Sequence, residues 1–261
     1  MEFNRVVGTR RSIRFFKSWR PVERAKIQVM FEAANRASRS MNADYFRAVV
    51  VNRDDLDAET RDALRNPTTT ADLDLAPTYI FWYIDLDYVA GAQDRLKELV
   101  DQHALPAAHG WSKAYVDNFL WPQVLEPISK DPNAVIFMGA VETGIAICNA
   151  INAAVDQGLG TCMHAFTAND KIKPLLGVPD TWLPVWLQLV GYPAEEREAG
   201  GQRPRRPLST LFFEGSCDHP WDEDLDVTEQ LTREGMIQEP GPFPYRAQEV
   251  RMLSRMYGLP E

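Results

Sequence analysis

The longest pattern of apolar positions runs from residue 139 to residue 166. Over 139–157, apolar side chains recur at every third or fourth position, which predicts one long helix. Its only charges are Glu142 and Asp156, and a helix that is apolar nearly all round is normally buried. Gly158 suits its C-terminus because glycine accepts the left-handed conformation common there. We therefore expect a core helix leading into an extended segment at 159–166, a setting that can also line a cofactor site or a dimer interface.

Shorter patterns predict the other elements. Strands are expected where β-branched and aromatic residues gather, at 46–51, 78–84, 160–165, 184–190 and 208–213. Helices are expected at 21–36, 57–64, 85–100, 170–176 and 246–257. The polar segments 66–74 and 194–202 are expected to be loops. Strands with helices between them indicate an α+β or α/β sandwich.

Composition narrows the class of protein. The chain has 261 residues, is 45% hydrophobic and 25% charged, and so resembles an ordinary globular protein. Its formal net charge of −9 argues against non-specific nucleic-acid binding. The three cysteines and four histidines show no disulfide framework and no metal-ligand spacing, so we expect no metal site. Dinucleotide and Walker signatures are absent from the sequence.

Targeting signals are also missing from the pattern. The first residues contain no apolar stretch of signal-peptide length, and the charges of the long helix interrupt the best membrane-span candidate. We therefore expect a soluble cytoplasmic protein that contacts no membrane.

Two basic clusters carry candidate chemistry. Residues 10–14 bring together Arg10, Arg11, Ser12 and Arg14, and a second cluster occupies residues 203–207. Arginine suits phosphate because its planar guanidinium can donate two parallel hydrogen bonds. The alternative is that each cluster is simply a solvated basic turn.

Two further segments could contact a ligand. Residues 38–42 carry small hydroxyls and an amide that could bind a ligand or merely form turns. Residues 102–132 contain several aromatic side chains in a proline-interrupted stretch. These aromatics could cap a pocket, or they could pack beneath a long loop.

Several segments, taken in chain order, resemble the FMN-dependent nitroreductase family. Residues 10–16, RRSIRFF, resemble its R-R-S-x-R-x-F opening, and residues 158–162, GLGTC, resemble its G-L-G-T segment. Residues 40–42 resemble part of its S-S-x-N-x-Q-P-W loop. The family's L-G-L-P, G-Y-P and K-x-R-x-P-L signatures are matched by 176–179, 191–193 and 203–208. Each motif is short, and their common order over residues 5–213 makes the resemblance specific.

The resemblance implies an α+β fold, an α-β-α sandwich whose central sheet is mostly antiparallel and flanked by helices. It implies a homodimer with FMN at the subunit interface. Residues 1–213 would form the FMN-binding domain, and residues 214–261 a C-terminal extension that packs on the partner subunit and is not an independent domain. NAD(P)H would reduce the flavin in a ping-pong reaction, and the flavin would then reduce a nitroaromatic, a quinone or a similar electron-poor substrate.

The resemblance also implies roles for single residues, with the flavin carrying the chemistry and no catalytic side chain required. Phosphate and ribityl contacts fall to Arg10, Ser12, Arg203 and Arg205, and Arg14 matches a cation near flavin N1 and O2. Contacts across the interface fall to Ser40 and Asn42, and backbone near N5 to His164 and Ala165. Arg11 and Arg39 adjoin these positions and complete the expected cofactor-binding set.

Departures from the family pattern leave the substrate open. Asp44, Tyr45 and Phe46 replace the usual Gln-Pro-Trp, and Ala165 stands where glycine is common. The same flavin could instead serve reductive dehalogenation, or dehydrogenation of a small aromatic or biosynthetic intermediate. An alternative of another class is a protein that binds and sequesters FMN with little turnover.

Overall fold

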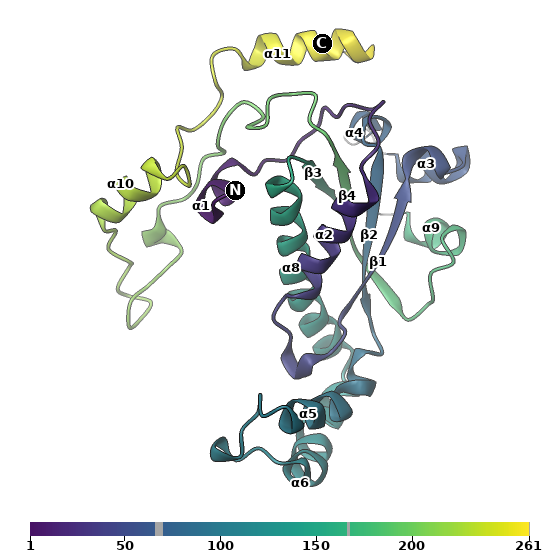
Figure 1. The fold of residues 1–261 in the computed structure, drawn as a ribbon, viewed down its shortest axis with the longest axis vertical. Helices are drawn as coiled ribbons and strands as arrows, with labels where there is room; N and C mark the ends of the chain where they lie inside the picture. Colours follow the sequence, from purple (N-terminus) through teal and green to yellow (C-terminus); the bar gives the residue numbers. More distant parts are fainter. Residues whose placement is uncertain (66–69, 166–167, 261) are drawn as a thin grey trace.

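A four-stranded antiparallel sheet forms the centre of the computed structural model, which describes residues 1–65, 70–165 and 168–260 (Figure 1). The strands are β1 (Phe46–Asn52), β2 (Thr78–Asp85), β3 (Gly160–His164) and β4 (Trp182–Gly191), in the order β1-β2-β4-β3. In the register of the two central strands, Phe81 lies opposite Leu187 and Trp82 opposite Trp186. Four predicted strands are thereby confirmed.

Helices cover both faces of this sheet. On one face, Ile80 and Trp82 are fully buried beneath α2 (Arg24–Asn35) and α8 (Pro132–Asp156). On the other face, Phe81 and Tyr83 pack beneath α3 (Ala58–Leu64), α4 (Thr70–Leu75) and α9 (Asn169–Leu175). Side chains alternate between the faces of a strand, so an unbroken apolar run suits a strand covered on both. The α-β-α sandwich is therefore confirmed.

Helix α8 differs from the prediction at its start and on one face. It begins at Pro132, where the Asp131 carboxylate accepts a hydrogen bond from the Asn133 backbone N–H at 3.0 Å. It ends before Gly158, whose φ of 78° confirms the expected left-handed terminus. Burial all round is wrong for this chain, because one stripe is solvent-exposed: Phe137 (70%), Val141 (49%) and Ile145 (40%). The opposite face packs on α2 and the sheet, and no described part of the chain covers this stripe.

Among the helices within the described residues, α8 alone has the length and hydropathy of a membrane span. Core helices of soluble proteins pass the same test. The residues of α8 that face α2 and the sheet, among them Ala146, Ala150 and Ala154, are fully buried in the hydrophobic core. Of its most apolar 18-residue window, 33% is buried, so α8 packs on the core along one face only.

The proline-interrupted stretch at 102–132 is mostly helical. It contains η4 (Ala107–His109), α6 (Lys113–Tyr115), the π-helical η5 (Val116–Leu125) and α7 (Glu126–Ser129). The helix expected just before it, at 85–100, is present as η3 (Tyr88–Gly91) and α5 (Ala92–Asp101). These elements extend from one end of the sheet, at the bottom of Figure 1. A further cluster of buried side chains, including Tyr45, Tyr88 and Val116, joins them to the body.

Two local predictions are wrong, and a third holds only in part. Residues 70–75 form helix α4 rather than loop, because Leu73 and Leu75 are buried in the core; residues 66–69 lie outside the described part. Residues 208–213 form no strand of the sheet: the 3-10 helix η6 (Leu208–Thr210) is followed by exposed apolar side chains. Residues 194–202 form the expected loop, but it is not wholly at the surface: Glu195 and 199–201 are buried, because the C-terminal tail covers them.

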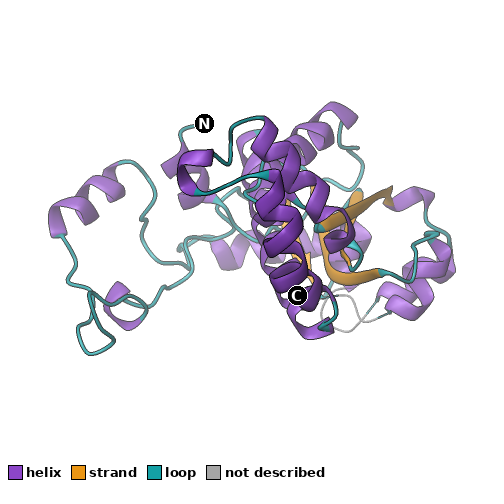
Figure 2. Cartoon of the chain, turned by 90° about the horizontal axis from the view of Figure 1, so that it is seen from below, coloured by secondary structure: helices purple, strands orange, loops and turns teal. Residues whose placement is uncertain are grey.

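The residues after 213 divide into two parts. Helix α11 (Arg246–Tyr257) packs on its own chain, where the Tyr257 hydroxyl donates to the Phe16 carbonyl at 2.7 Å. Residues 208–233, which include α10 (Leu225–Arg233), form an arm that projects from the body (Figure 2). Its exposed apolar side chains are Leu208, Leu211, Phe212, Phe213, Trp221, Leu225 and Val227. Packing of the extension on a partner subunit stays a prediction, which now concerns this arm.

Candidate functional site

The first basic cluster runs along the edge strand β3. The Ile13 backbone N–H donates to the Thr161 carbonyl at 3.0 Å, and Ser12 forms a parallel bridge with Thr161. Gly160 permits this close approach, because a Cβ there would lie 2.6 Å from Ile13 Cγ1. The packing fixes the positions of Arg10, Ser12 and Arg14 relative to the end of β3.

We expect Gly160→Ala to lower stability. The added methyl meets the buried Ile13 side chain, and overpacking of this kind costs roughly 1–3 kcal/mol. For a chain of this size each kcal/mol lowers the melting temperature by about 2–4 °C. The control is Gly91→Ala, whose Cβ would only touch the flexible Arg95 side chain at 3.4 Å, and a surface change of this kind costs about 0.5 kcal/mol. Equal melting temperatures for the two variants would contradict the close packing at Gly160.

Arg11 is the buried arginine of the cluster. Its guanidinium donates to the carbonyls of Gly8 at 2.6 Å and Gly201 at 3.0 Å, and to the Gln238 side chain at 2.6 Å. These acceptors come from three separate parts of the chain. The hydrogen bonds of Arg11 therefore connect the N-terminal segment to the loop at 194–202 and to the C-terminal tail.

The second basic cluster lies near the first. Burial lowers the pKa of Arg11, Glu198 opposes that shift, and the positive charges of Arg10, Arg203 and Arg205 lower the pKa further. A charge shifts the pKa of a neighbouring group noticeably only when the two groups lie close together, because salt screens longer distances. Within the described parts of the chain, none of these three arginines forms an ion pair with a carboxylate. Their uncompensated positive charge suits a phosphate group.

Arg14 is fixed in place by a hydrogen bond from its backbone N–H, and its side chain is exposed. The buried Glu195 carboxylate accepts hydrogen bonds from the backbone N–H groups of Arg14 at 2.5 Å and Phe15 at 3.0 Å. Arg246 of α11 balances the charge of Glu195 at 2.5 Å. Neither Glu195 nor Arg246 was expected to matter, because the sequence does not show which surface charges the tail will bury.

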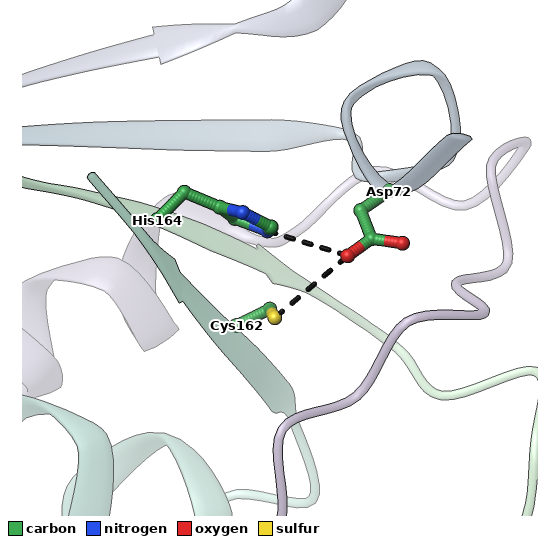
Figure 3. A group of neighbouring side chains, drawn as sticks. All are labelled: Asp72, Cys162 and His164. Carbon is green, nitrogen blue, oxygen red and sulfur yellow. Dashed lines mark hydrogen bonds and ion pairs between the residues drawn. The ribbon is translucent and has the colours of Figure 1, made fainter. Parts of the chain in front are cut away.

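At the end of β3, the side chains of Asp72, Cys162 and His164 face one another (Figure 3). Asp72 Oδ2 lies 3.3 Å from His164 Nε2 and 3.9 Å from Cys162 Sγ. Burial raises the pKa of the Cys162 thiol to about 12, with a further rise from Asp72, while the positive charge of Arg14 lowers it. Arg14 therefore lies near this group. Ala165 follows directly after the strand.

This group was not expected from the sequence. Residues alternate between the faces of a strand, so Cys162 and His164 could have been placed on one side of β3. Asp72 lies 90 residues from Cys162, inside a segment that was expected to be loop. No local pattern links it to the other two.

The remaining predicted contacts lie elsewhere. Ser40 and Asn42 belong to η1 (Ser40–Asn42), at the opposite end of α2 from the basic clusters (Figure 1). The 12 residues of α2 correspond to about 18 Å. The Ser40 hydroxyl donates to Glu142 at 2.9 Å, and Arg39 pairs with Asp44 at 3.0 Å. A single chain therefore does not bring these residues to Arg10 and Arg14.

Comparison with known proteins identifies the family of this chain. The profile of the nitroreductase family matches residues 7–192. This chain therefore belongs to the nitroreductase family.

Individual relatives are distant. An NADPH-dependent oxidoreductase of Staphylococcus aureus (strain MRSA252) is 23% identical over 212 residues, which cover 79% of this chain and 70% of that protein. The crystal structure of a nitroreductase family protein from Streptococcus pneumoniae TIGR4 matches with a TM-score of 0.63 at 20% identity, over 82% of this chain and 100% of that one. A nitroreductase-like protein from Exiguobacterium sibiricum 255-15, solved in complex with FMN, matches with a TM-score of 0.64 at 17% identity, over 81% and 96%.

Proposed function

We propose that the protein is an FMN-dependent oxidoreductase that accepts electrons from NAD(P)H and delivers them to a small electron-poor compound. The observation that carries this proposal is that Arg11 is hydrogen-bonded to Gly201, next to the second basic cluster, and that the charges of Arg10, Arg203 and Arg205 all act on it. None of these three arginines has a carboxylate partner among the described residues. The FMN complex of a structural neighbour and the NADPH dependence of a curated relative support it. FMN, when bound, supplies the two-electron chemistry.

The phosphate of FMN would be held by Arg10, Arg203 and Arg205, with the Ser12 hydroxyl as a further donor. Three guanidinium groups of one sign repel one another, and a phosphate removes that repulsion while it accepts their hydrogen bonds. Arg11 has already donated to protein acceptors, so we assign it to holding the cluster together rather than to the phosphate.

The flavin ring would lie toward the end of β3. There the exposed guanidinium of Arg14 can offset the negative charge of the reduced cofactor. The backbone of His164 and Ala165 would offer hydrogen-bonding groups to the ring, because β3 is an edge strand that ends at His164.

A homodimer would complete this site. Ser40 and Asn42 follow the C-terminal end of α2, whereas residues 12 and 13 pair with β3, so we assign Ser40 and Asn42 to the partner's flavin. The Ser40 hydroxyl donates a hydrogen bond to Glu142, so the lone pairs of its oxygen could accept a hydrogen bond from a flavin N–H. We assign Arg39 to positioning this loop through Asp44. The exposed stripe Phe137, Val141 and Ile145 supplies an apolar surface for the interface.

The rest of the chain fits the same proposal. We assign residues 1–213 to the FMN-binding domain and the tail to a C-terminal extension whose arm, 208–233, packs on the partner. The protein would be soluble and cytoplasmic. An aromatic series, Trp111, Tyr115 and Phe119, has ring centroids 5.6 Å and 5.5 Å apart in sequence order and supports an aromatic or quinone substrate.

The proposal is tested by mixing the flavin-loaded protein with NADPH, and separately with NADH, in the absence of oxygen. We expect the absorbance of the oxidised flavin to disappear with at least one nucleotide and to return when a nitroarene or quinone is added. Absorbance that persists with both nucleotides would contradict the oxidoreductase and favour a protein that only sequesters FMN. The rates with the two nucleotides then measure the coenzyme preference.

A further inference from the structure

Three side chains with metal-binding chemistry meet between α4 and β3. Cys162 and His164 lie on the same side of β3, and Asp72 reaches them from α4 (Figure 3). Their donor atoms all lie within 4.8 Å of one another. The flavin contacts proposed above use the backbone at His164, so these three side chains have no part in that proposal.

The imidazole nitrogen in this group contacts the Asp72 carboxylate but forms no hydrogen bond with a described residue. His164 Nε2 is buried and forms no hydrogen bond with any described residue, although Asp72 Oδ2 lies 3.3 Å away. The His164 and Asp72 side chains are only 11% and 10% exposed. Buried polar atoms in proteins are nearly always hydrogen-bonded or bound to a ligand. An ion held between the three side chains would satisfy this nitrogen.

The distances fit a tetrahedral ion. Zinc binds sulfur at about 2.3 Å and imidazole or carboxylate at about 2.0–2.2 Å, which keeps neighbouring ligand atoms about 3.4–3.6 Å apart. Two of the observed separations, 3.3 Å for nitrogen to oxygen and 3.9 Å for sulfur to oxygen, need shifts of only a few tenths of an ångström, and the nitrogen and sulfur lie within 4.8 Å of each other.

The charges and ligand types also fit. A thiolate and a carboxylate together balance a divalent cation, and a neutral imidazole completes the set, so no net charge is left in this buried place. Thiolate with imidazole favours zinc over magnesium or calcium, which prefer oxygen ligands alone.

We propose that Asp72, Cys162 and His164 bind one divalent cation of the zinc type, leaving a fourth coordination position for water or another small ligand. The ion would join α4 to β3, two elements whose ligands are 90 residues apart in the chain. This proposal rests on the geometry of the three side chains and does not depend on FMN binding.

The test uses the flavin-loaded, full-length protein, purified without a histidine tag, treated with a chelator and then dialysed against Co²⁺. We expect about one Co²⁺ per chain after gel filtration, together with the visible bands of tetrahedral thiolate-bound cobalt at wavelengths beyond the flavin absorption. The chelator should lower the melting temperature of the wild-type protein, because the bound ion stabilises the folded state.

Variants localise the site. Cys162→Ser changes one atom, and it should abolish the cobalt bands and reduce retained cobalt well below one per chain. Cys217→Ser is the matched control, because Cys217 is exposed and stands next to Asp218 and His219, a sequence that could itself attract cobalt. This control should keep the full cobalt content.

Two results would overturn the proposal. One is wild-type protein that retains no stoichiometric Co²⁺, which would leave the group as a metal-free cluster of buried side chains. The other is cobalt retained equally by the wild type and the Cys162→Ser variant. X-ray absorption of the cobalt-loaded wild type guards against a variant that fails to fold, because a sulfur ligand must appear in its first coordination sphere if Cys162 binds the ion.

Discussion

Arg10→Ala is expected to weaken FMN binding by about ten- to a hundred-fold. A hydrogen bond between charged groups contributes roughly 1.5–3 kcal/mol, and each 1.4 kcal/mol is about a factor of ten in the dissociation constant. Arg10 forms no ion pair with any described carboxylate, so its removal takes charge from the proposed phosphate site without leaving a protein anion unpaired. The dissociation constant can be measured from the quenching of flavin fluorescence during titration of the apoprotein.

Arg251→Ala is the matched control for this experiment. Arg251 is an exposed arginine on α11, outside both basic clusters, so its loss changes the net charge equally. We expect its FMN affinity to match that of the wild type. An unchanged dissociation constant for Arg10→Ala would remove Arg10 from the phosphate site, and an equal loss in both variants would show that only net charge matters.

Phe137→Glu is expected to dissociate the proposed homodimer and to release flavin with it. Phe137 is 70% exposed in one chain and lies on the apolar stripe of α8. A carboxylate buried unpaired in an apolar interface costs roughly 3–5 kcal/mol, so the dimer should weaken by about a hundred-fold or more. Sedimentation at micromolar concentration, with the ratio of flavin to protein recorded on the same sample, measures both effects.

The control places a charge on another exposed apolar side chain. Leu175 is 44% exposed on α9, in the helical layer on the far side of the sheet from α8. Leu175→Lys should leave both the sedimentation coefficient and the flavin content unchanged. A monomeric wild-type protein that still holds flavin would contradict the interface altogether.

The strands were predictable because their environment is uniform. Every residue of β2 is buried, so its continuous apolar and aromatic run correctly predicts a central strand. The run at 208–213 looks similar in sequence, but it lies on the projecting arm with no sheet edge beside it. The sequence shows that a segment is apolar, but it does not show what the segment packs against. For the same reason the exposed stripe of α8 was mistaken for core.

The site was predictable in its chemistry and less so in its details. Arginines in two distant clusters were expected to converge, and the hydrogen bond from Arg11 to the Gly201 carbonyl at 3.0 Å brings the two segments together. The sequence could not tell whether Arg10 or Arg11 would be free to bind phosphate. Only the fold shows that it is Arg11 whose guanidinium donates to the carbonyls of Gly8 and Gly201. Asp72 was missed because a pairing with β3 across 90 residues leaves no local pattern.

The central claim is that this chain binds FMN, and the most direct measurement is the visible absorption spectrum of the purified protein. The released cofactor is then identified after heat denaturation. We predict the bands of an oxidised flavin and release of FMN, close to one per chain. A colourless protein that cannot be reconstituted with FMN would contradict the account, and the roles proposed for Arg10, Ser12, Arg14, Arg203 and Arg205 would have to be withdrawn.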